Sequence, residues 1–157
     1  MHQVFWLRPR TLAGRTGPDR DAWNPEELAH GGIGAVLSVN DGELVCPEDL
    51  AEAGISHHCV PFSDNAPPQP GDFDTCVSAL PKALAFTTTA IESGRGVLVH
   101  CHSGKDRTGL FLAYYLCQIE DLPPIEAIAE VRRVRPIALS AEGWGPFALR
   151  VLDALDA

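Results

Sequence analysis

The sequence lacks the features that mark secreted, membrane-spanning and metal-binding proteins. Its five cysteines are an odd number and include no Cys-x2-Cys pair, so neither a disulfide framework nor a structural zinc site is indicated. The longest apolar stretch is too short to span a bilayer, and the short apolar run near the start leads straight into Arg8-Pro9-Arg10, unlike a secretory leader. We therefore expect a cytoplasmic protein with free thiols, no integral membrane segment and no bound metal.

Positive charge is also scarce. Lysine and arginine number 12 and aspartate and glutamate number 21, which gives a net charge of −9. This balance argues against nucleic acid as a partner, and an anionic substrate would have to be drawn in by a local positive field. The 157 residues are enough for one domain with a substantial core, so we expect a single domain over residues 1–157. The sequence does not indicate the oligomeric state.

Helices alternate with short strands along the chain. Compact apolar runs indicate the strands, and apolar residues at helical spacing indicate the helices. The predicted strands cover residues 4–7, 35–39, 55–60 and 97–99, and the predicted helices begin near residues 25, 47, 73, 110, 124 and 147. This alternation predicts an α/β fold with a central, mostly parallel sheet of about four to five strands flanked by helices.

Two features of this pattern carry further expectations. Pro81 lies inside the helix that begins near residue 73. Because an interior proline costs about 3 kcal/mol or more, a kink or a break is expected near residue 80. Residues 8–22 and 61–72 are expected to be long loops, and long loops in compact domains are often functional.

The most informative segment runs from residue 100 to residue 109 and joins the buried strand at 97–99 to the following helix. Backbone N–H groups at such a turn, together with the positive end of the helix, favour a bound anion. Gly104 and Gly109 allow the close approach of the backbone that this geometry needs. A cysteine in such a positive field ionises readily, so Cys101 is the candidate nucleophile.

Five residues separate Cys101 from Arg107. The planar guanidinium of Arg107 can hold two phosphate oxygens and stabilise a five-coordinate phosphorus transition state. Thr108 can donate its hydroxyl to the thiolate and ease its departure in a second step. The candidate substrate-binding residues lie between the cysteine and the arginine: His102, Ser103, Gly104, Lys105 and Asp106. By itself, this set would also fit a sulfur-transfer loop or an inert anion-binding turn.

With its flanking strand and helix, the segment resembles the Cys-x5-Arg-Ser/Thr signature of the protein tyrosine phosphatase superfamily, and the chain is similar to the small atypical dual-specificity phosphatases. Residues 60–68 resemble their general-acid loop, and residues 127–136 resemble their penultimate helix. The resemblance implies a phosphatase-like fold, no cofactor, and hydrolysis of phosphate monoesters through a Cys101 phosphoenzyme. It also implies that His100 holds the loop backbone from outside the pocket. A rhodanese-like sulfurtransferase and a non-catalytic phosphate-binding module are the alternatives.

The general acid has two candidates. Asp64 lies in the segment that resembles the acid loop, where it can protonate the leaving oxygen and then activate water as a base. Asp106 stands just before the loop arginine, and an aspartate at this position is thought to act as the acid in the myotubularin branch of the superfamily. We favour Asp64, and Asp106 remains open.

The substrate is less defined than the chemistry. The Gly-Lys-Asp-Arg sequence at 104–107 resembles bacterial phosphatases that accept phosphoinositides as well as phosphotyrosine. Lys105 could neutralise a second phosphate, or it could be a solvated lysine at the rim. Residues 140–144 occupy the region where larger tyrosine phosphatases carry a water-positioning glutamine, so strict phosphotyrosine selectivity is not expected. The expected partner is a phosphorylated protein or a phosphoinositide.

Other reactive or charged residues are expected to be structural. The remaining cysteines are interpreted as buried small hydrophobic residues: Cys46, Cys59, Cys76 and Cys117. A disulfide between one of them and Cys101 could protect the nucleophile, but the sequence does not indicate which. Three arginines, at 132, 133 and 135, could bind an acidic partner, but we interpret them as a solvated helix end.

Overall fold

The computed structural model describes residues 1–156, and its centre is a five-stranded sheet in the order β1-β2-β5-β3-β4. The strands are β1 (Phe5–Arg8), β2 (Leu12–Arg15), β3 (Ile33–Ser38), β4 (Ser56–Cys59) and β5 (Gly96–His100). Only the β1–β2 pair is antiparallel, and the other neighbours run parallel. The predicted α/β fold with a mostly parallel sheet is therefore confirmed.

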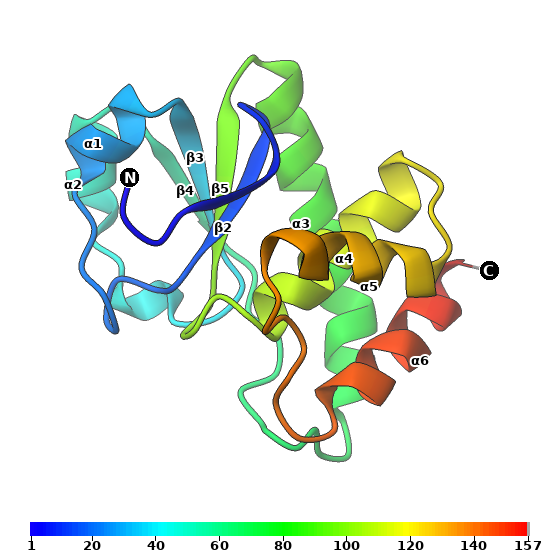
Figure 1. The fold of residues 1–157 in the computed structure, drawn as a ribbon. Coiled ribbons are helices and arrows are strands. Elements are labelled where there is room, and N and C mark those ends of the chain that lie inside the picture. Colours follow the sequence, from blue (N-terminus) through cyan, green and yellow to red (C-terminus); the bar gives the residue numbers. More distant parts are fainter. Residues whose placement is uncertain (157) are drawn as a thin grey trace.

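Helices cover both faces of this sheet (Figure 1). On one side lie α1 (Pro25–His30) and α2 (Pro47–Glu52), with the 3-10 turn η1 (Gly42–Leu44) between them in sequence. On the other side lie α3 (Asp72–Glu92), α4 (Arg107–Ile119), α5 (Pro124–Val134) and α6 (Trp144–Asp156). No helix within residues 1–156 is long and apolar enough to cross a membrane.

The central strand β5 is buried along its whole length. Val97 and Val99 belong to the larger core, beneath α3 to α6, whereas Leu98 belongs to the smaller core beneath α1 and α2. Successive side chains of a strand point to opposite faces, so an apolar residue is needed at every position when both faces are covered. This explains why the run at 97–99 shows no alternation of polar and apolar residues.

Part of the predicted loop at 8–22 is the strand β2, which corrects that prediction. β2 is four residues long and contains Gly14, so it gave no periodic signal. Its place is set by pairing with β1 on one side and β5 on the other. Arg15 is buried at its end, and the guanidinium donates to the carbonyls of Thr16 and Asp21 at 2.7 and 2.8 Å.

α3 runs unbroken from Asp72 to Glu92 with Pro81 inside it, so the expected break near residue 80 is wrong. Proline has no N–H group, so one carbonyl in the preceding helical turn lacks its usual donor. Because Pro81 lies on the exposed face of α3, water can bind to that carbonyl instead. Leu80 and Ala83 on the buried face are packed in the main core. Tertiary packing of this apolar face therefore outweighs the local cost of the proline.

Candidate active site

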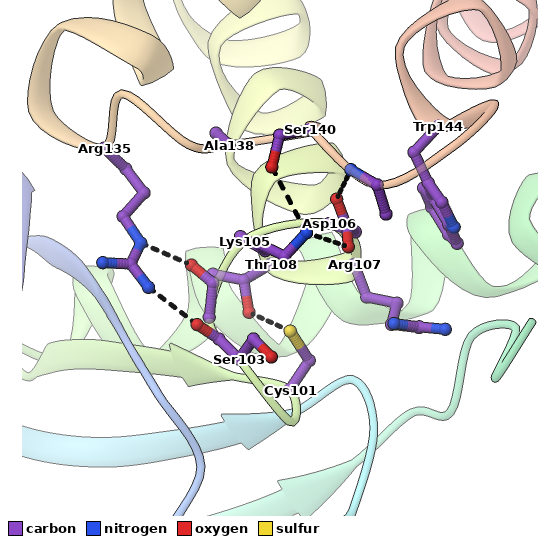
Figure 2. A network of polar contacts seen from close by, with 12 residues as sticks. Cys101, Ser103, Lys105, Asp106, Arg107, Thr108, Arg135, Ala138, Ser140 and Trp144 are labelled. Carbon is purple, nitrogen blue, oxygen red and sulfur yellow. Dashed lines mark hydrogen bonds and ion pairs between the residues drawn. The ribbon is translucent and has the colours of Figure 1, made fainter. Parts of the chain in front are cut away.

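The loop of residues 101–106 connects the carboxyl end of β5 to the start of α4, the edge of a parallel sheet where ligands commonly bind. Cys101 is only 1% exposed, and Thr108 Oγ1 lies 3.1 Å from its sulfur in donor geometry (Figure 2). Gly104 has φ +66°, and a Cβ there would lie 2.5 Å from the carbonyl oxygen of Arg15. The loop therefore requires a glycine at this position.

The loop carbonyls are bonded from outside the loop. The His102 carbonyl accepts from the N–H of Gly17 at 3.0 Å, and the Lys105 carbonyl accepts from the N–H of Leu139 at 3.2 Å. Within residues 1–156, the backbone N–H groups of residues 102–107 have no hydrogen-bond acceptor. A run of unpaired N–H groups before the N-terminus of a helix is a site for an anion.

Arg107 connects the loop to the segment that carries Asp64. Its Nε donates to the carbonyl of Ser63, and its Nη2 lies 3.4 Å from the carbonyl oxygen of Asn65. The Trp144 indole donates to the same Asn65 oxygen at 2.9 Å, and its ring centroid lies 5.1 Å from the Arg107 guanidinium carbon. Both neighbours of Asp64 are thus held by their carbonyls against the loop arginine.

The Asp64 side chain itself is exposed, and no hydrogen bond or ion pair among residues 1–156 engages its carboxylate. Asp72, at the start of α3, instead anchors the segment. Its carboxylate accepts from the Asn65 amide at 3.0 and 3.1 Å and from the Gln69 N–H at 2.6 Å. Burial acts to raise the pKa of Asp72, but these hydrogen bonds outweigh it and hold the pKa below its ordinary value.

Asp106, the alternative acid, occupies a different environment. It is 4% exposed, its Oδ1 accepts from the backbone N–H of Ala141 at 3.2 Å, and its Oδ2 lies 3.3 Å from the Lys105 ammonium. Lys105 also donates to the Ser140 hydroxyl at 3.2 Å (Figure 2). Asp106 therefore links the loop to residues 140–141, directly through the N–H of Ala141 and indirectly through Lys105.

His100 lies behind the loop and is completely buried. Its Nδ1 lies 3.2 Å from the carbonyl oxygen of Cys101, and its Nε2 contacts the Ser38 hydroxyl, which is also 2.8 Å from Nε2 of His57. Since a carbonyl can only accept, Nδ1 carries the proton, Nε2 accepts from Ser38, and His57 donates to Ser38. Burial lowers the pKa of His100 to about 4, so the ring is neutral near neutral pH.

Two further arginines, Arg20 and Arg135, contact the loop. Arg135 donates to the carbonyls of Ser103 and Gly104 at 2.7 and 3.2 Å (Figure 2). Arg20, from the segment between β2 and α1, donates to the Ser103 hydroxyl at 3.1 Å. The expectation that Arg135 belongs to a solvated helix end is therefore wrong, because its head group reaches back to the loop carbonyls.

The loop residues predicted from sequence lie together. The side chain of His102 contacts a residue outside the loop, because its Nδ1 lies 3.0 Å from a carboxylate oxygen of Asp41.

The predictions for the other cysteines hold in part. Cys76 and Cys117 are buried, whereas Cys46 and Cys59 are exposed, at the start of α2 and the end of the edge strand β4. All five cysteines are free thiols in the structure.

Several residues that complete the site were not predicted from the sequence, namely Arg20, Ser38, Asp72, Arg135 and Trp144. Only Trp144 carried a signal, since a tryptophan between two glycines at a helix start is unusual for a surface turn. The others are brought to the loop by pairing and packing between elements far apart in the sequence. No group of three or more potential metal-binding side chains is found within residues 1–156.

A buried cysteine lies at the end of a parallel strand, unpaired amides follow it, and an arginine begins the next helix, an arrangement suited to holding an anion beside a thiol. Residues 1–140 match the family model described as "PTP-SAK: Swiss Army Knife protein, DSP-PTPase phosphatase domain". The chain therefore belongs to the dual-specificity phosphatases of the cysteine-dependent protein tyrosine phosphatase superfamily, as the resemblance predicted.

Curated relatives agree with this family. Dual specificity protein phosphatase 12 of Rattus norvegicus is 30% identical over 131 residues, which cover 83% of this chain and 36% of the relative. The Homo sapiens protein is 31% identical over 120 residues, which cover 76% and 34% of the two chains. This chain thus spans about a third of the length of these relatives.

Solved structures share the fold. The active form of Tk-PTP superimposes with a TM-score of 0.79 at 22% identity, over 99% of this chain and 97% of that one. PTPMT1 in complex with PI(5)P gives a TM-score of 0.78 at 19% identity, over 98% and 94% of the two chains. At this identity the likeness concerns the fold alone.

Proposed function

We propose that this protein hydrolyses phosphate monoesters in two steps through a phosphorylated Cys101. The observation that supports this most is the surroundings of the sulfur. The Cys101 thiol lies under a loop of unpaired N–H groups at the start of α4, and Thr108 Oγ1 is 3.1 Å away in donor geometry. Such surroundings favour a bound phosphate, because the unpaired N–H groups and the start of the helix carry partial positive charge.

In the first step, the Cys101 thiolate attacks phosphorus, the bond from phosphorus to the leaving oxygen breaks, and that oxygen takes a proton from Asp64. The loop amides and Arg107 hold the equatorial oxygens of the transition state. In the second step, the Asp64 carboxylate takes a proton from water, the water oxygen attacks phosphorus and the phosphorus–sulfur bond breaks. Thr108 donates to the departing thiolate, and inorganic phosphate leaves.

Asp64 is preferred over Asp106 because of what surrounds each carboxyl group. A general acid must exchange a proton with substrate and water, which an exposed carboxyl without other partners can do. Asp106 is buried, its Oδ1 accepts a hydrogen bond from the N–H of Ala141, and its Oδ2 is paired with the Lys105 ammonium. Asp64 also lies between two residues whose carbonyls bind Arg107, so its segment is kept beside the site.

An aryl phosphate assay tests both parts of the mechanism. Cys101→Ser should abolish turnover and retain binding of vanadate, and turnover at the wild-type rate would refute the covalent route. Asp64→Asn should lower kcat by about 10²–10⁴-fold and remove the alkaline decline of the pH profile. Asp74→Asn, an exposed aspartate at the start of α3, is the matched control and should change little.

This assay, together with measurements of phosphate binding and of sulfur transfer, separates the remaining alternatives. If Asp64→Asn retains near-normal turnover and Asp106→Asn does not, Asp106 is the acid. A wild-type protein that binds phosphate without turnover would be a non-catalytic binding module. Transfer of sulfur from thiosulfate without aryl phosphatase activity would identify a sulfurtransferase, although the curated relatives described above are named as dual specificity phosphatases.

A further inference from the structure

A cavity of about 280 Å³ lies beside the phosphate loop, and it is lined mainly by polar and charged residues. One of them, Arg135, lies across the loop from Arg107 (Figure 2). Arg20 comes from the segment between β2 and α1, Lys105 from the loop itself, and Arg135 from the residue after α5. Thr16 and Ser103 add hydroxyl groups. We call this cavity the cationic cleft.

The cleft concentrates positive charge in a protein whose net charge is −9. Three cationic side chains line it, against the single carboxylate of Asp21, which is also paired with His2 at 2.9 Å. Lys105 is held by Asp106 and Ser140, which leaves Arg20 and Arg135 as the main source of positive field. Guanidinium groups stay charged in proteins, so two of them side by side favour an anion between them.

The two arginines retain donors that an anion could use. Arg135 engages the loop through Nε and Nη2, and its Nη1 has no hydrogen-bond partner within residues 1–156. Arg20 uses only Nη1, toward the Ser103 hydroxyl. Burial lowers the pKa of Arg135, and the nearby Cys101 acts in the opposite direction. The positive charge of Arg20 lowers the pKa of Arg135 further, which agrees with the two guanidinium groups lying close together.

The cleft is connected to the phosphate site through Ser103. The Ser103 carbonyl is bound by Arg135 and its hydroxyl by Arg20, and Ser103 is two residues from the nucleophile. Because two residues of extended chain span at most ~7 Å, an anion in the cleft would lie close to a phosphate above Cys101. A single small substrate could therefore place one phosphate in each position.

We propose that the cationic cleft is a subsite for a second phosphate of the substrate, and that the substrate is a polyphosphorylated polyol, such as an inositol bisphosphate, free or as a lipid head group. The cavity is smaller than the ~300–1,000 Å³ of pockets that enclose whole small molecules, which suits one appended phosphate. The hydroxyl groups of Thr16 and Ser103 match those of a polyol ring. This inference rests on the proposed phosphatase activity.

The test compares kcat/KM for a soluble inositol bisphosphate with that for the matching inositol monophosphate. The bisphosphate should be preferred by about tenfold or more, since a hydrogen bond to a charged group accounts for about 10–100-fold. Arg20→Gln should reduce this preference toward one. Arg10→Gln makes the same charge change at the β1–β2 turn, at the other end of the sheet, and should leave the preference intact. Arg20 is chosen over Arg135 because Arg135 also anchors the loop.

The same ratio measured with phosphoinositides in phosphatidylcholine vesicles distinguishes a lipid from a free polyol. A preference in vesicles alone would identify a lipid head group, and a preference in solution would identify a free polyol phosphate. Equal rates for bisphosphate and monophosphate, or a preference that survives Arg20→Gln, would overturn the subsite. A stronger preference for a doubly phosphorylated peptide would overturn the polyol class.

Binding provides a readout that does not depend on turnover. In a Cys101→Ser background, calorimetry with the inositol bisphosphate should show about tenfold weaker binding when Arg20→Gln is added, and a smaller effect for the monophosphate. If the aryl phosphate assay fails while this difference is found, the proposed function fails and the subsite stands. If turnover is found without this difference, the subsite is refuted and the phosphatase stands.

Discussion

The buried histidine behind the loop predicts a specific pH dependence of stability. His100 has a pKa of about 4 in the fold against an ordinary value of 6.5, because burial disfavours its charged form. Between these values the unfolded chain binds more protons than the folded one. The contribution of His100 is therefore fully present above pH 6.5 and is lost as the pH falls toward 4.

Over the interval from pH 7 to pH 5, linkage gives a loss of about 2 kcal/mol in the free energy of unfolding from this single residue. The charged or titratable neighbours of His100 are His57, Asp41 and Arg15. Burial also lowers the pKa of His57, so it adds to the loss in the same direction. Aspartate and glutamate titrate mainly below pH 5 in the unfolded chain, so they contribute little to the loss in the free energy of unfolding between pH 7 and pH 5.

Urea unfolding of the wild type and of His100→Asn at both pH values isolates the effect, since groups common to both proteins cancel. The wild type should lose about 2 kcal/mol more than the variant. If the variant does not fold, the NMR titration of the His100 ring in the wild type gives the same answer. An equal loss in both proteins, or a midpoint near pH 6.5, would refute the reasoning.

Three further substitutions have defined expectations. Thr108→Val removes the donor to Cys101 and should lower kcat by about 10–100-fold, with a phosphoenzyme burst in rapid-quench assays, and steady turnover without a burst would contradict the second step. Trp144→Phe removes the donor to the Asn65 carbonyl and some core volume, and should cost about 1–3 kcal/mol in denaturant unfolding, whereas a change near zero would contradict that packing. Pro81→Ala restores an N–H on the exposed face of α3 and should raise the free energy of unfolding by about 1–2 kcal/mol, and a destabilised variant would show that the proline imposes no net cost on the helix.

Local patterns predicted the parts of the fold that depend on local physics. The run at 97–99 and the helix after Arg107 could be read from sequence because burial on both sides demands uninterrupted apolar residues. β2 could not be read in this way, since a four-residue strand with Gly14 has no period of its own. Its position follows from pairing with β5, a contact between residues far apart in the chain.

The same distinction applies to the site. The loop from Cys101 to Thr108 is one continuous segment, so its residues could be recognised by their spacing. Ser38 and Arg135 reach the loop from β3 and from the residue after α5, and nothing in their own neighbourhood marks them. A buried hydroxyl and a helix-end arginine have many structural roles, and only the folded chain shows that both contact this loop.

These distant contacts explain how the loop presents its amides. In a tight turn, carbonyls held outward leave the N–H groups free to face the centre. The carbonyls of residues 102–105 are each bonded from outside, by Gly17, by Arg135 and by the N–H of Leu139. Donors from two separate segments, the one between β2 and α1 and the one between α5 and α6, therefore orient the loop before any anion arrives. Because this orientation requires no reorganisation when phosphate binds, the geometry supports catalysis by preorganised electrostatics.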